Sequence, residues 1–436
     1  MISYYSFPHS YVWRWLLRWQ LQVSGSTKDP LGGPFFVLPL HLMQTTYPIL
    51  ILKPGSEEHM QNRHHAIYRT SVQTMPLCDN GSIVEVHSHT GEFLCFATIN
   101  NRSYLCGRAF SFEQGDPMET LRRLIKRAIA LRDHLPSLQG TDAIRLINAE
   151  GDSIPGLIVD QYGDYLIAQL TTVGMDRLKV FLFDLLMELR APKGIYEKST
   201  GSARKKEALG DREGWVRGKG TETITVTERG LKFLISPSGS QKTGLFLDQR
   251  EMRSVVRQHA AGLTVLDVCS YVGGFGLAAL SGGAIAADSV DYDPEAIETG
   301  NRHAALNGFS PDQSTMYCED AFDFLRRRPF PRPYDFIILD PPAFAKRDTE
   351  LDLAKHAYTD LNRMAMEMLP PGGLLLTCSC SYQIDTGLFQ TIVFHAARQA
   401  KRSVRILQRH HHAEDHPVNI YHPETDYLKS MLLWVE

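Results

Sequence analysis

The spacing of apolar and polar residues divides the chain into regions with different hydrophobic periods. From Tyr47 to about Phe112, short runs such as SIVEVHS and FLCFATIN lie between Gly and Asn turn signals. This pattern predicts a small β-barrel or β-sheet module. Residues 1 to 45 follow neither a strand nor a helix period, and Met43 stands just before the first strand pattern. Met43 is therefore a candidate for the true start of the protein.

A helix is predicted directly after this β-rich region. Asp116 and Pro117 supply start signals, and Leu121 and Ile125 fall on one helical face. The flanking faces are basic, with Arg122, Arg123, Lys126 and Arg127. We interpret them as a solvated surface in preference to a phosphate-contacting stripe, because charge runs of this kind usually serve solubility.

The remainder of the chain changes its pattern once more. Residues 144 to 235 contain strand, turn, strand, helix and strand signals, with two strands joined at Tyr162 to Asp164, which predicts a small α+β unit. The later runs TVLDVC, SVDYD, FIILD and GLLLTCS are short apolar strands separated by helix-length segments. This alternation is typical of an α/β fold with a doubly wound parallel sheet.

We therefore expect four regions: a poorly patterned extension over 1–45, a β-rich domain over 46–117, an α+β domain over 118–235 and a doubly wound domain over 236–436. A length of 436 residues suits several domains. The net charge of -3 decides nothing about nucleic-acid binding, since a basic face can hide in a neutral average. Seven scattered cysteines indicate reduced thiols and a cytoplasmic protein. No apolar run approaches the ~20 residues of a membrane span.

Ligands of open α/β sheets lie beyond the carboxyl ends of the strands, so residues at those ends are candidate site residues. Asp267 ends the first strand and can hold a ligand polar group, while Gly273 and Gly274 let the backbone approach that ligand. Asp291 ends the second strand and is placed for ribose hydroxyls. Asp320 follows the third strand and suits an adenine amino group.

The fourth and fifth strands end in groups that suit catalysis. Asp340 to Phe344 form the turn DPPAF, in which two prolines make the backbone rigid. Cys378 and Cys380 follow two residues apart, so in an extended segment they share a face. One or both thiols can therefore face the ligand crevice.

Two polar runs have weaker claims to function. The first contains four histidines: His410, His411, His412 and His416. Clustered histidines without a paired ligand segment usually form a polar loop, so we predict no metal site. The second run, Arg204 to Glu207, could touch phosphates but is typical of a solvated loop.

Six motifs in order resemble the bacterial PUA-domain cytosine-5 methyltransferases of large-subunit ribosomal RNA. They lie between Gln241 and Val418 and read QKTGLFLDQRE, LDVCSYVGGFG, VDYDPEAI, DPPAFAK, TCSCS and AEDHPV. The resemblance implies a class I, Rossmann-like methyltransferase domain, S-adenosylmethionine as cofactor and 23S ribosomal RNA as partner, with Phe246 in a segment over the cofactor. The β-rich region resembles a PUA domain more loosely. The oligomeric state stays open, a homodimer included.

The chemistry implied by this resemblance explains the paired cysteines. Because C5 of cytosine is a poor nucleophile, these enzymes add a thiolate to C6, which lets C5 attack the sulfonium methyl group. Asp340 is placed to act as the acid near N3. We favour Cys380 as the nucleophile, because its distance along the chain from Gly372 and Gly373 is comparable to that of the nucleophile from the matching glycines in related enzymes. Relatives with a product-releasing cysteine carry it where this chain has Ala343, so release needs another base, either Cys378 or water.

Two other functions stay open at this point. The first is methylation of a guanine nitrogen in ribosomal RNA, a reaction that needs no thiol and is therefore disfavoured by TCSCS. The second is a non-catalytic, PUA-type RNA-binding factor in ribosome assembly. The presence of Asp340 and both thiols disfavours this second alternative.

Overall fold

The computed structural model describes residues 47–239, 243–345 and 347–436. Residues 47–436 form one compact body, which we describe below as three units built around separate sheets. The proposed start at Met43 and the extension over 1–45 lie outside the described residues. None of the helices in the described ranges combines the length and the apolar character that a membrane span requires.

A six-stranded sheet opens the described chain, with the strand order β2-β6-β5-β4-β1-β3. Its elements are β1 (Ile49–Leu52), α2 (Glu58–Gln61), β2 (Ala66–Tyr68), the 3-10 turn η1 (Arg69–Ser71), β3 (Val72–Thr74), β4 (Ile83–His87), β5 (Phe93–Ile99) and β6 (Leu105–Ser111). Alternating apolar residues of these strands, such as Val84 and Val86, form a core of their own. The β-rich module expected here is therefore present.

The helix expected next is α3 (Pro117–His134). The carboxylate of Asp116 accepts a hydrogen bond from the backbone N–H of Met118. Pro117 stands in the first turn, where a backbone N–H would have no partner within the helix, so proline is tolerated there. Leu121, Ile125 and Ala128 are buried on one face, as the helical period predicts.

A five-stranded sheet with the order β11-β10-β9-β8-β7 forms the second unit. Its elements are η2 (Pro136–Leu138), β7 (Ala143–Asn148), η3 (Ala149–Asp152), β8 (Leu157–Tyr162), β9 (Tyr165–Leu170), α4 (Val173–Arg190), β10 (Gly194–Ser199), α5 (Ser202–Lys206) and β11 (Arg212–Gly218). Strands β8 and β9 pair antiparallel with Tyr162 opposite Tyr165, so the turn predicted at this point is confirmed.

The basic run in α5 corrects one of our interpretations. We expected a solvated loop, but Arg204 is fully buried in a short helix. Its guanidinium donates to the carbonyl oxygen of Leu170 at 2.6 Å and to Asp176 at 3.1 Å. A buried guanidinium with such partners stabilises the fold and is not available to a phosphate.

The third unit contains a hairpin and a seven-stranded sheet in the order β16-β15-β14-β17-β18-β20-β19. Its elements are β12 (Ile224–Glu228), β13 (Leu231–Ile235), η4 (Leu247–Gln249), α6 (Arg250–His259), β14 (Thr264–Val268), α7 (Gly274–Ser281), β15 (Ala286–Asp291), α8 (Pro294–Leu306), β16 (Ser314–Cys318), α9 (Ala321–Arg326), β17 (Phe336–Leu339), η5 (Asp348–Glu350), α10 (Leu351–Met368), β18 (Gly373–Ser379), α11 (Thr386–Ala400), β19 (Val404–His410), η6 (Pro423–Thr425) and β20 (Lys429–Val435).

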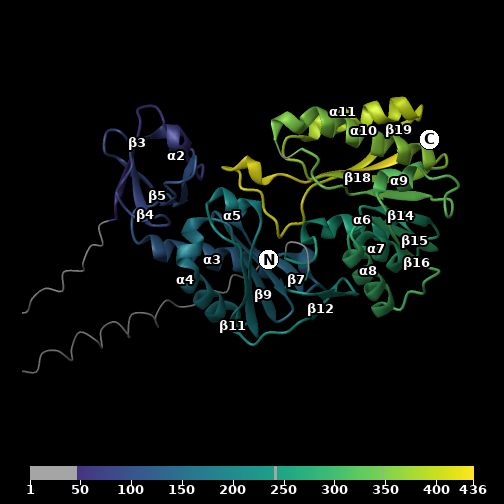
Figure 1. Cartoon of the computed structure of the whole chain (residues 1–436), viewed down its shortest axis with the longest axis horizontal. Coiled ribbons are helices and arrows are strands. Elements are labelled where there is room, and N and C mark those ends of the chain that lie inside the picture. The colour runs from purple at the N-terminus through teal and green to yellow at the C-terminus, as the bar shows by residue number, and fades with distance from the viewer. Residues whose placement is uncertain (1–46, 240–242, 346) are drawn as a thin grey trace, which may run out of the picture. The chain divides into compact units, whose positions relative to one another are not determined.

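The doubly wound arrangement is confirmed in this unit. Val265 and Ile338 pack with α6 and α7, whereas their neighbours Leu266 and Ile337 pack with α10 and α11. Figure 1 shows these two pairs of helices on opposite sides of the sheet. Alternate residues of each strand point to opposite faces, so strands covered on both sides are apolar throughout.

The sheet differs from a wholly parallel one at one edge. Strands β14 to β18 are parallel, but β20 pairs antiparallel with both β18 and β19. The chain thus turns back after β19 and inserts β20 between two earlier strands. This insertion brings the segment before β20 to the carboxyl end of β18.

Candidate functional site

A pocket of about 320 Å³ lies at the carboxyl ends of the parallel strands, where the sequence predicted a ligand site. The lining includes backbone and side chains from the ends of β14, β15, β17 and β18 and from the segments before α6 and β20. Among the site residues predicted from the sequence, it contains Phe246, Gly274, Asp291, Asp320, Asp340 and Cys380.

The turn after β14 forms the floor of this pocket. Gly273 has φ of +73°, a left-handed conformation that glycine adopts without strain, and it precedes α7 directly. A side chain at Gly273 would meet the sulfur of Met316 at 3.2 Å. Gly274 lines the pocket and Gly273 does not, so the close approach of this backbone to a ligand stays a prediction.

Asp267 does not line the pocket, so our expectation that its carboxylate holds a polar group of the ligand is corrected. It is fully buried, and its Oδ2 accepts a hydrogen bond from the backbone N–H of Gly276 at 3.0 Å. Burial, together with the nearby charges of Asp340 and Asp291, raises the pKa of Asp267 to about 7. Asp267 therefore stabilises the start of α7 behind the pocket lining and does not contact the pocket itself.

Asp291 and Asp320 line the pocket, and each carboxylate accepts hydrogen bonds from backbone N–H groups. Asp291 accepts from the backbone N–H groups of Tyr271 at 2.8 Å and Asp293 at 3.1 Å, which fix its orientation at the end of β15. Asp320 is exposed and caps α9 by accepting from the N–H of Phe322 at 2.8 Å. Each carboxylate keeps acceptor capacity for a ligand donor.

Asp340 and Cys380 come together at the ends of β17 and β18. The amide of Gln249 donates to Oδ1 of Asp340 at 2.9 Å. The thiol of Cys380 contacts the carbonyl oxygen of Pro341 at 3.8 Å, and both residues line the pocket. An acid and a thiol therefore share one wall, as the sequence predicted.

Cys378 lies differently from its neighbour. It is fully buried among apolar residues of the sheet, and it does not line the pocket. Burial, reinforced by the charge of Asp340, raises its pKa well above the usual range. A thiol that resists ionisation and has no access to a ligand is a poor nucleophile and a poor proton acceptor.

Several lining residues had no functional assignment from the sequence. Gln249 lies inside the motif QKTGLFLDQRE, and its position beside Asp248 was the one available signal. Tyr427 and Leu428 reach the pocket from the segment before β20. The phenol of Tyr427 donates to Oδ2 of Asp248 at 2.5 Å, which links that segment to η4.

Two motif residues serve the core and not the pocket. Arg250 and Asp415 are fully buried and form an ion pair at 2.9 Å. Asp415 also accepts from the ring nitrogen Nδ1 of His416 at 2.9 Å and from the backbone N–H of Arg145 at 2.9 Å. The motif AEDHPV therefore connects the second unit to the third.

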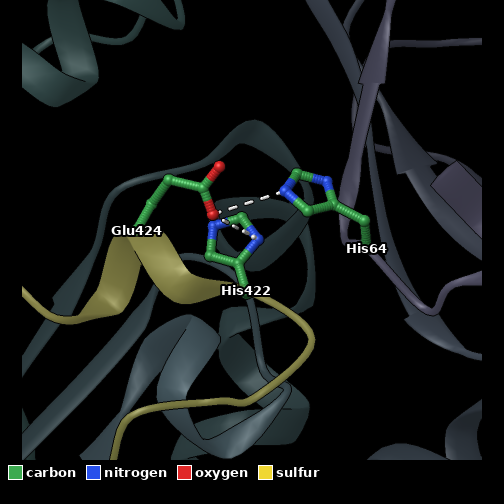
Figure 2. A group of neighbouring side chains, drawn as sticks. All are labelled: His64, His422 and Glu424. Atoms are coloured by element: carbon green, nitrogen blue, oxygen red, sulfur yellow. Dashed lines mark hydrogen bonds and ion pairs between the residues drawn. The ribbon is translucent and has the colours of Figure 1, made fainter.

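A separate group of side chains has the composition of a metal site. Figure 2 shows His64, His422 and Glu424, with Oε2 of Glu424 lying 3.4 Å from Nε2 of His64 and 3.8 Å from Nδ1 of His422. However, the backbone N–H of Ala66 donates to Nδ1 of His64 at 3.2 Å, which leaves the ring proton on Nε2. A metal ligand needs that nitrogen unprotonated and usually donates through the other one. We therefore describe the group as a hydrogen-bonded cluster, and the absence of a metal stays a prediction.

Comparison with protein families identifies two regions. Residues 205–427 match the model of an S-adenosylmethionine-dependent methyltransferase, and residues 50–112 match a PUA-like domain. A solved methyltransferase complexed with SAH matches with a TM-score of 0.77 and 24% identity, covering 89% of this chain and 100% of the other. A Streptococcus mutans protein described as a SAM-dependent methyltransferase matches with a TM-score of 0.75 and 23% identity, over 89% and 100%. These structures show the fold.

Curated relatives extend the likeness along most of the chain. The ribosomal RNA large subunit methyltransferase I of Aliivibrio fischeri is 36% identical over 385 residues, covering 87% of this chain and 97% of the relative. The enzyme of the same name from Vibrio cholerae is 36% identical over 389 residues, covering 88% and 98%. The similarity therefore spans nearly the whole length of each relative.

Proposed function

Since the chain belongs to the family of the ribosomal RNA large subunit methyltransferases I, which are S-adenosylmethionine-dependent enzymes, we propose that it methylates C5 of a cytosine in 23S ribosomal RNA. The observation that carries the cytosine assignment is the pair of Cys380 and Asp340 on one pocket wall. Methyl transfer to a guanine nitrogen would need no thiol.

The pocket offers polar groups that suit S-adenosylmethionine. We propose that Gly274 lets the backbone approach the ligand, that Asp291 accepts from ribose hydroxyls and that Asp320 accepts from an adenine amino group. Phe246 adds an apolar edge, with its ring 5.3 Å from that of Tyr271. The cofactor supplies an electrophilic methyl group on a sulfonium.

The chain's own residues prepare the cytosine. The Cys380 thiolate adds to C6 while Asp340 in its protonated form donates a hydrogen bond at N3, so the negative charge of the adduct is stabilised as it develops. The hydrogen bond from Gln249 fixes the Asp340 carboxyl group for this task. Because Cys378 is buried and resists ionisation, we assign removal of the C5 proton to water and not to Cys378.

The RNA must present its base outside a duplex. A paired and stacked cytosine cannot offer C6 to a thiol, so we propose a single-stranded or flipped target. The PUA-like sheet and the second unit are the surfaces that we propose to hold the RNA. A homodimer, a cytoplasmic location and the domain bounds 46–117, 118–235 and 236–436 stay predictions.

The direct test of this function is to map 5-methylcytosine in 23S ribosomal RNA from cells with and without the protein. We expect one cytosine to lose its C5 methyl group in the absence of the protein and to regain it when the gene is restored. Loss of a methylguanine with every 5-methylcytosine unchanged would instead support the guanine-nitrogen alternative.

Replacing Asp291 by Ala is expected to weaken binding of S-adenosylmethionine by about 1 to 3 kcal/mol, the range for hydrogen bonds that involve a charged group. Titration calorimetry measures this change. Asp293→Asn is the matched control, because Asp293 lies in the same loop and caps α8, and Asn caps helices equally well. Equal affinity of the Asp291 variant and the wild type would remove Asp291 from the cofactor site.

A further inference from the structure

The buried lysine at the start of β20 has no task in the proposed function. Lys429 is 5% exposed, and its ammonium donates to the carbonyl oxygens of Ser381 and Tyr427, each at 2.7 Å. Within the ranges that the structure describes, no carboxylate lies within 4.0 Å of this ammonium. A buried cation without an anionic partner destabilises a fold. The presence of Lys429 therefore indicates that a negatively charged group forms nearby when the protein is active.

The register of the sheet places Lys429 next to the segment that carries Cys380. Strands β18 and β20 pair antiparallel with Ser379 opposite Lys429. Cys380 is the next residue along the chain, and the Lys429 ammonium bonds to the carbonyl group of Ser381 directly after it. The ammonium of Lys429 is thus held at the carbonyl group of the residue that follows Cys380.

The electrostatic surroundings of the thiol include the same lysine. Among the described residues, the charge of Cys380 acts on the pKa values of Cys378, Tyr358, Tyr427 and Lys429, and Lys429 is a cation. Burial lowers the pKa of Lys429, while the charge of Cys380 opposes this effect more strongly than those of Asp426 and Asp385. Asp340 also faces the thiol from the same pocket wall.

We propose that the Lys429 ammonium stabilises the thiolate form of Cys380 and so acts as a positioning residue for the nucleophile. The thiol proton passes to solvent, Lys429 keeps its three protons, and the sulfur lone pair becomes available for attack on C6. The inference rests on the proposed function, which makes Cys380 the attacking thiol.

The test is the pH dependence of Cys380 alkylation by iodoacetamide in the full chain, without RNA or cofactor and with each cysteine quantified by mass spectrometry. Lys429→Gln keeps N–H donors but loses the charge. In this variant we expect the midpoint of the pH profile for Cys380 alkylation to rise by about one pH unit or more. The rate at neutral pH then falls about tenfold, since the rate follows the thiolate fraction. Lys429→Arg should restore the wild-type midpoint. Lys355→Gln is the matched control, because Lys355 pairs with Asp352 on the surface of α10.

Three results would overturn the inference. The first is an unchanged midpoint in a folded Lys429→Gln variant. The second is an Arg variant that behaves like the Gln variant, which would assign Lys429 to packing alone. The third needs no variant: a wild-type midpoint at or above the ordinary thiol value of about 8.5 would show that the thiolate is not stabilised.

Alkylation also separates this inference from the proposed function. It reports the thiolate without requiring RNA or methyl transfer. If the Gln variant shifts the midpoint but wild-type Cys380 forms no adduct with a cytosine analogue, the proposed function fails while the role of Lys429 stands.

Discussion

Cys380→Ala is expected to abolish methyl transfer, with a loss on the order of 10⁴-fold or more, because no other described thiol lines the pocket except Cys269, which burial keeps protonated. The variant should also fail to form a covalent adduct with RNA that carries 5-fluorocytosine at the target. In the wild type this adduct should persist, since fluorine cannot leave C5 as a proton. Gel shift under denaturing conditions and mass spectrometry of the crosslinked peptide measure both effects.

The matched control for this prediction is Cys378→Ala. Because Cys378 is buried away from the pocket, its replacement should leave the adduct intact and remove only the packing of one sulfur. A crosslink found on Cys378 would reverse the assignment. A fully active enzyme that forms no crosslink would rule out the covalent mechanism.

The largest expected effect on stability comes from Asp415→Asn. This change removes one partner of a buried ion pair and leaves the Arg250 guanidinium, which is fully buried, without its nearest carboxylate. Breaking such a pair typically lowers the free energy of unfolding by about 3 to 5 kcal/mol. Urea denaturation measures the loss. Glu414→Gln is the control, because Glu414 is the exposed neighbour and should change stability by no more than about 0.5 kcal/mol.

The same carboxylate predicts how stability depends on pH. Burial alone would raise the pKa of Asp415, but the charges of His416 and Arg250 outweigh burial and hold this pKa well below its usual range. Its contribution is therefore fully present above the unfolded value of about 3.9 and is lost as the pH falls below that value. Between about pH 5 and pH 3, the wild type should lose free energy of unfolding faster than Asp415→Asn. Parallel curves for the two proteins would contradict this prediction.

The parts of the site that could be predicted from the sequence are those that depend on local pattern. Asp291, Asp340 and Cys380 each follow an apolar strand, and the carboxyl ends of parallel strands meet at one edge of a sheet. Asp267 looked equivalent but lies one residue before the end of β14. That difference places its side chain in the buried interior.

The remaining parts of the site depend on the order of the strands in the sheet. The spacing of apolar residues within a strand or helix does not specify that order. Tyr427 and Leu428 reach the pocket because β20 inserts beside β18, and the sequence shows only an apolar run at this position. Arg250 lies in the motif QKTGLFLDQRE, yet its partner Asp415 lies 165 residues away. Long-range pairs of this kind follow from the fold and cannot be read from spacing.

The insertion of β20 between β18 and β19 also bears on when the sheet is completed during synthesis of the chain. Domains usually fold as units while the chain emerges from the ribosome. Here, residues 429–435 fill the gap between two strands made earlier, so β18 and β19 have no neighbour in common until that segment has emerged. A nascent chain that stops at residue 428 has neither a continuous sheet nor Lys429. We therefore expect the seven-stranded sheet to be complete only once β20 has been translated.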